Sequence, residues 1–166
     1  MLPSIDLRIA NMIKALEQVI LPALPKRERL ARDQANLVMG HLRMMSTQWK
    51  AAARFEETTL DGMIGLAERL AGIIGGATQH RLAAAVADAR LADRRDVDSL
   101  EAAYNALGRV VDDAILGGED HAPLPQAAVD ALLDYGAVQS HRERTWFKGN
   151  GLDPHASELP EIDAIL

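Results

Sequence analysis

The chain has 166 residues, of which 48% are hydrophobic and only six are aromatic, and its formal net charge is −6. It contains no cysteine, which excludes disulfide-stapled folds, zinc–thiolate sites and cysteine nucleophiles. A modest charge with this many apolar residues also argues against a disordered chain.

Alanine and leucine occupy 50 positions, alternation with a period of two is missing, and β-branched residues do not cluster. This composition predicts an all-α protein, an antiparallel bundle with four main helices. We expect one helical domain over residues 1–148 and an irregular tail over residues 149–166.

The first helix is expected over about residues 4–21. Ser4 is a suitable N-cap, and the apolar residues after it recur at helical spacing. Pro22 and Pro25 are expected to end this helix, because proline lacks an amide donor and clashes with the preceding turn.

A very long second helix is expected over residues 26–74. Two adjacent apolar stripes run through it, and no strong helix breaker occurs before Gly62. Thr58, Thr59 and Asp61 suggest a kink near residues 58–62. Gly75 and Gly76 then mark a turn that would close a hairpin with the following arm.

That arm is expected over residues 78–116, as one helix interrupted near residues 93–98 or as two helices placed end to end. The interruption is a charged segment in which Asp98 and Glu101 have the spacing of a capping box. Pro123 and Pro125 mark the next loop, and a last helix is expected over residues 125–147. The tail ends in apolar residues, so it is predicted to dock on the bundle or on a partner subunit.

The charge is unevenly distributed along the chain. Residues 1–54 sum to +5 and residues 55–166 to −11. The basic half lacks the aromatic and polar readers typical of nucleic-acid binding, so no nucleic-acid partner is expected. No apolar run reaches the length of a membrane span, the first residues lack the basic start of a secretory signal, and a cytoplasmic location is expected.

Polar residues follow one edge of the apolar stripe in the second predicted helix. Gln34, His41 and Gln48 are spaced by seven, Trp49 lies beside them, and Glu56 falls inside the stripe. A polar group on a buried face needs a hydrogen-bond partner. The line is therefore a structural network between helices, the lining of an interhelical pocket for a small molecule, or ordinary exposed surface.

A second concentration of binding residue types lies at the end of the last helix: His141, Arg142, Arg144 and Trp146. Arginine and tryptophan are enriched where proteins bind one another. The alternative is a helix end whose cations complement the helix dipole.

Neither a metal nor a cofactor is expected. The Glu-x-x-His spacing of di-iron bundles does not occur, and neither does a glycine-rich phosphate loop or a nucleophile elbow. The sequence therefore predicts a self-associating interaction or accessory protein without catalysis of its own, with a dimer favoured and a further protein partner possible. The alternative is a small-molecule-binding protein or enzyme with a pocket around His41, Gln48 and Glu56.

Overall fold

The computed structural model describes residues 2–117 and 123–166, and it is helical, without a β-strand, over these ranges. The all-α prediction is thus confirmed. The expected number of four main helices was wrong, because the described residues form six helices of at least eleven residues: α1 (Ile5–Ala15), α3 (Arg29–Gln48), α4 (Ala52–Ile74), α5 (Gly76–Ala89), α6 (Val97–Ile115) and α7 (Gln126–Phe147).

The first helical segment agrees with the sequence prediction. The Ser4 hydroxyl accepts a hydrogen bond from the Leu7 amide at 3.2 Å and caps α1. The segment continues through a π-helical turn, η1 (Leu16–Ile20), and a last turn, α2 (Leu21–Ala23), which contains Pro22. The Arg32 guanidinium then donates to the carbonyls of Leu21 and Leu24, so that the backbone acceptors at the helix end are satisfied.

The predicted 26–74 helix is broken, and the position predicted for the kink was wrong. The break lies at residues 49–51, where the Ala51 amide donates to the Gln48 carbonyl at 2.8 Å. Residues 58–62 stay helical, and the Thr58 hydroxyl donates back to the Arg54 carbonyl within the helix. The sequence offers no helix breaker at residues 49–51, and two side chains of this segment are held by α1.

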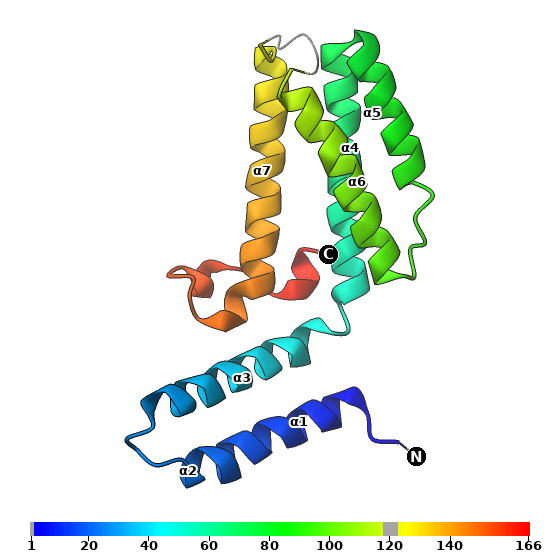
Figure 1. Ribbon diagram of the computed structural model, residues 1–166. Coiled ribbons are helices and arrows are strands. Elements are labelled where there is room, and N and C mark those ends of the chain that lie inside the picture. The colour runs from blue at the N-terminus through cyan, green and yellow to red at the C-terminus, as the bar shows by residue number, and fades with distance from the viewer. Residues whose placement is uncertain (1, 118–122) are drawn as a thin grey trace. The chain divides into compact units, whose positions relative to one another are not determined.

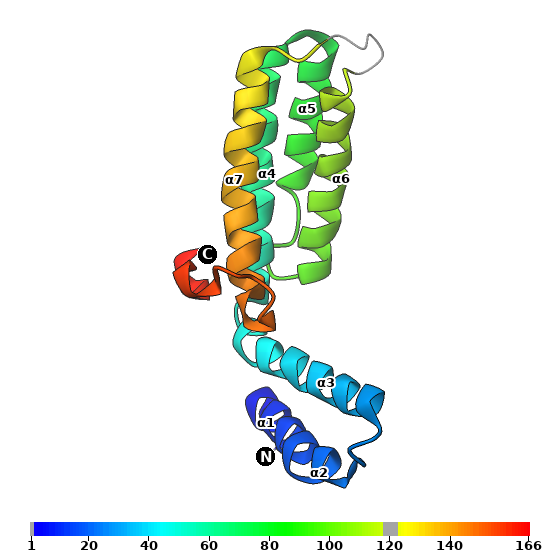
Figure 2. The same cartoon turned by 90° about the vertical axis from the view of Figure 1, so that its left-hand side faces the viewer.

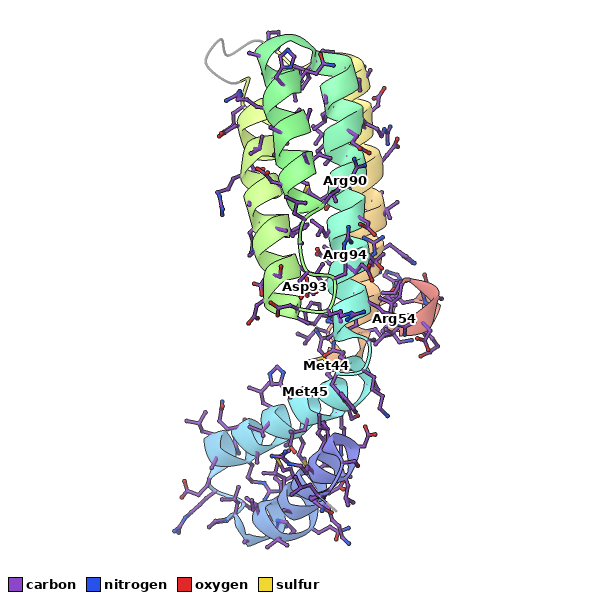
Figure 3. All side chains as sticks on the ribbon, turned by 90° about the vertical axis from the view of Figure 1, so that its right-hand side faces the viewer. Met44, Met45, Arg54, Arg90, Asp93 and Arg94 are labelled. Atoms are coloured by element: carbon purple, nitrogen blue, oxygen red, sulfur yellow. The ribbon has the colours of Figure 1, made fainter. Side chains whose placement is uncertain are left out.

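The segment from 78 to 116 is neither one interrupted helix nor two helices end to end. Helices α5 and α6 run in opposite directions beside α4 (Figures 1 and 2). The charged segment between them makes the turn. Arg90 at the end of α5 pairs with Glu68 of α4 at 2.5 Å, and Arg94 in the charged segment pairs with Asp61 of α4 at 2.8 Å. Figure 3 labels the two arginines. The N-cap of α6 is Asp96, which accepts from the Asp98 amide, instead of the predicted Asp98.

The last helix, α7, confirms the predicted 125–147 helix, while part of the loop predicted before it lies outside the described residues. The expected hairpin turn at Gly75 and Gly76 is present, but it joins α4 to α5. The tail contains three short 3₁₀ turns, η3 (Lys148–Asn150), η4 (Ala156–Glu158) and η5 (Ile162–Ala164).

The chain divides into two compact units. One comprises residues 1–51 and 143–165, and the other comprises residues 52–142 together with residue 166. Helix α7 therefore supplies its last turn to the first unit and the rest to the second. The division into a domain of residues 1–148 and a tail of residues 149–166 stays a prediction.

The second unit holds the main hydrophobic core. Helices α4, α5, α6 and the larger part of α7 contribute to it, and α7 does so through alanines, Ala128 and Ala131, that are completely buried. Such small side chains permit close helix approach. The largest side chains that are completely buried in this core are leucines: Leu60, Leu70, Leu82, Leu100 and Leu107.

The first unit has a far smaller core. In α1 and α3 the buried apolar residues are Ile9, Ala35, Met39 and Met44. Many large apolar side chains on the same two helices stay exposed.

Candidate functional site

The α1–α3 hairpin, formed by residues 4–50, is held together along one side by polar contacts. Asp6 accepts from the Trp49 indole at 2.8 Å and from the Lys50 ammonium at 2.7 Å. These two hydrogen bonds, with that of Lys50 as the larger cause, lower the pKa of the Asp6 carboxyl. Further along, Arg43 pairs with Glu17 at 3.3 Å. The polar side of the hairpin is therefore built from ion pairs between its two helices.

The opposite side of the hairpin is apolar. A helix turns by about 100° per residue, and on this spacing six exposed apolar side chains of the hairpin lie on the side away from Glu17 and Arg43. We call this surface the hairpin face and define it by Ile5, Met12, Ile20, Leu30, Val38 and Met45, which are 44% to 74% exposed.

The π-helical turn η1 places Ile20 on this face. A π turn holds an extra residue compared with an α turn, and it delays the phase of the residues after it by about 100°. Without it, Ile20 would point toward α3. With it, Leu21 takes the inward position and Ile20 stays 44% exposed.

The polar line predicted in the second helix does not form one pocket. Gln34 and His41 are exposed on α3, within the angular range of the hairpin face. Gln48 is half-buried and its amide donates to the main-chain carbonyl of Trp146 at 2.8 Å. Glu56 belongs to the second unit. The pocket around His41, Gln48 and Glu56 stays a prediction, because the three are not brought together within either unit.

Trp49 is half-buried at the end of the hairpin. Besides its bond to Asp6, its ring lies 5.2 Å from the Lys50 ammonium, within cation–π range. Trp49 therefore has a structural role, because its indole holds the end of α3 against α1.

Glu56 is half-buried on α4, and its environment raises the pKa of its carboxyl. Burial is the main cause and the negative charge of Glu101 on α6 is the second. A carboxylate pair of this kind favours the protonated acid. In the described residues no group of three or more carboxylate or imidazole side chains could hold a metal ion.

The second predicted group is divided between the two units. Arg142 is half-buried in the second unit and donates to the Gln139 amide oxygen at 2.6 Å, whereas His141 is exposed on the same helix. Arg144 and Trp146 lie in the first unit. The four residues therefore do not act as one cluster within either unit.

Arg144 anchors the tail. Its guanidinium binds both carboxylate oxygens of Asp153, at 2.8 and 3.2 Å, and the His155 amide donates to the same carboxylate. These contacts lower the pKa of Asp153 to about 2, with the Arg144 hydrogen bond as the largest cause. Bidentate arginine–carboxylate pairs fix geometry strongly, so the loop after α7 is clamped to the last turn of the helix.

Trp146 lines a hollow of about 420 Å³ between α3 and the tail. Met44, Lys148 and Ile162 contribute to the same lining, and Lys148 pairs with Glu161 at 2.8 Å across the tail. Sequence reasoning identified Trp146 and missed the others. Lys148 could have been found from the sequence, because it lies next to the aromatic residues at the end of the last predicted helix. Ile162 is brought to the hollow only by the tertiary fold.

No family model matches the chain, and no curated protein or solved structure is similar to it. In the described residues no helix is both long enough and apolar enough to cross a membrane.

Proposed function

We propose that this protein is a self-associating interaction or accessory protein without catalysis of its own. The observation that carries the proposal is the apolar surface of the first unit. Ten of the large apolar side chains that are exposed fall within residues 2–45, on or beside α1 and α3. Exposed apolar side chains gathered in one region are typical of a surface that binds protein.

The small core of the hairpin supports the same proposal. Two helices alone bury little apolar surface, and hydrophobic burial is the main favourable contribution to folding and association. A partner that covers α1 and α3 would supply the burial that the hairpin lacks. A homo-oligomer, with a dimer favoured, is the simplest such assembly. The cytoplasmic location expected from the sequence stays a prediction.

Sedimentation-velocity ultracentrifugation of the full chain over a hundredfold range of concentration tests the proposal. We expect the weight-average mass to rise from one chain toward two or more with concentration. A mass equal to one chain at every concentration would overturn it. Addition of salt should not dissociate the oligomer, because apolar contacts are not screened by ions.

A further inference from the structure

We infer that the hairpin face binds the same face of a second copy of the chain, so that two α1–α3 hairpins pair about a twofold axis. This inference rests on the proposed function and deepens it by naming the surface and its occupant. Three observations carry it: the repeat of the apolar residues, the distribution of charge around the hairpin, and the area involved.

The spacing of the face residues is that of helices that pack lengthwise on other helices. Val38 and Met45 are seven residues apart, and so are Ile5 and Met12. A repeat of seven keeps side chains on one line along a helix pair, which is the pattern of bundle and coiled-coil seams. The π turn at η1 preserves the line, because it carries Ile20 onto it despite a spacing of eight from Met12.

The charge distribution favours a second copy over an anionic surface. The ion pairs of Asp6 with Lys50 and of Glu17 with Arg43 lie on the other side of the hairpin. On the apolar side, helical spacing places the charged Arg8 of α1 and the uncharged Gln34 of α3 near the face. A twofold interface must be complementary to itself, and a face this poor in charge meets that condition. A nucleic acid or an anionic membrane would require a row of cations.

The exposed area is that of a small but specific dimer. Six half-exposed aliphatic side chains present on the order of 300 Å² of apolar surface, and pairing two such faces doubles that figure. With the ordinary apolar share of about 57% for an interface, the whole contact is about 1,000 Å², the lower bound of specific interfaces. The dimer is therefore expected to dissociate on dilution.

Gln34 and His41 are also placed along this face, seven residues apart on α3. In helix pairs, a polar residue inside or beside an apolar seam selects one register over others. The polar line found in the sequence thus has a role in the dimer: it fixes how the two copies align. This role depends on the spacing of seven between Gln34 and His41, and it does not require the interhelical pocket predicted from the sequence.

The test is a charge substitution on the face, with a matched substitution off it. Met12→Glu and Met45→Glu should each weaken dimerisation by at least about tenfold in ultracentrifugation. Leu7→Glu and Asn36→Glu are the controls, because Leu7, which is 51% exposed, and Asn36, also exposed, lie on the same two helices but away from the face. The controls should change the dissociation constant by less than about twofold. Circular dichroism and the melting temperature establish that each variant is folded.

A second measurement does not depend on a destabilising substitution. The chain has no cysteine, so a single introduced thiol is unique. Met45→Cys should be cross-linked to the second copy by a bismaleimide reagent, whereas Asn36→Cys, exposed on the other side of α3, should not.

The outcomes separate the two proposals. A wild-type chain that stays monomeric overturns both the self-association and the pairing of faces. A wild-type oligomer that is unaffected by Met12→Glu and Met45→Glu overturns only the pairing of faces, and so does equal cross-linking at residues 36 and 45. Dissociation by the Leu7→Glu and Asn36→Glu controls as well would also overturn the assignment to this face.

Discussion

The side-chain amide of Gln48 donates to the main-chain oxygen of Trp146 at 2.8 Å, and this bond ties the last turn of α3 to the last turn of α7. The two residues are 98 positions apart in the chain. From the sequence, Gln48 and Trp146 belong to two separate groups of candidate binding residues. The structure joins one member of each group in a single contact of the first unit.

Gln48→Ala should therefore loosen the tail from α3. The substitution removes the donor and leaves a half-buried carbonyl without this partner, at a cost of about 1 kcal/mol. We expect faster amide hydrogen exchange in residues 146–163 and little change in α4–α6. His41→Ala, on the same helix but exposed, is the matched control and should leave the tail unchanged. Equal exchange in Gln48→Ala and the wild type would contradict the prediction.

The tail should also respond to acid. The pKa of Asp153 is lowered to about 2 from an ordinary value of 3.8 by Arg144 and by the His155 amide. A carboxyl with a lowered folded-state pKa stabilises the fold at pH values above its ordinary pKa, and this contribution is lost as the pH falls through the folded value. We expect the loop around Asp153 to detach between about pH 4 and pH 2.

Nuclear magnetic resonance of the loop amides over this pH range measures the transition. Asp153→Asn removes the titrating group, so its loop should be detached already at neutral pH and show no such step. A step of the same size in the Asn variant would assign the transition to another carboxyl, and Glu158, which pairs with His155, is the first one to examine.

The local sequence signals were sufficient for most helices but not for their breaks. The predicted end near residue 147, the Ser4 cap and the turn at Gly75 follow from chemistry within a few residues. The break at residues 49–51 does not, because the apolar stripe continues through it. It forms where Trp49 and Lys50 bind Asp6, more than forty residues away, and such contacts override local propensity.

Contacts between distant segments also explain why the surroundings of the candidate residues could be predicted only in part. A spacing of seven placed Gln34, His41 and Gln48 on one line, and they do share one helix. The spacing cannot reveal that a neighbour covers only the end of that line, where Gln48 meets Trp146. The exposed apolar face next to Gln34 was also hidden, because a stripe in a sequence looks the same whether it is covered by the chain or left open.

Glu56 provides a test in the second unit. Burial and Glu101 raise the pKa of its carboxyl, so the folded state holds a proton more tightly than the unfolded state. A raised folded-state pKa means that stability is highest below the ordinary value of 4.5 and falls as the pH rises through the folded value. Glu56→Gln should therefore raise the melting temperature at pH 7 and have little effect at pH 4.

Glu57→Gln is the matched control for this experiment. Glu57 is the next residue on α4 and its carboxylate lies 3.7 Å from the Arg94 guanidinium, so its charge is favourable. Its replacement should leave the melting temperature at pH 7 unchanged or slightly lower. An increase for Glu57→Gln equal to that for Glu56→Gln would show that lower net charge alone, instead of the Glu56 environment, is the cause.

The turn between α4 and α5 depends on the backbone of Gly75. Its φ of 72° and ψ of −168° fall in a region that is open essentially only to glycine. Gly75→Ala should cost about 1–3 kcal/mol of folding stability, although an added Cβ would meet no atom within 4 Å. Gly72→Ala is the matched variant: Gly72 lies inside α4, also has open space around it, and gains about 0.5–1 kcal/mol from the helix propensity of alanine. Chemical denaturation should thus shift the two variants in opposite directions, and a loss of stability in both would mean that bulk at this end of α4, not the conformation of Gly75, sets the requirement for glycine.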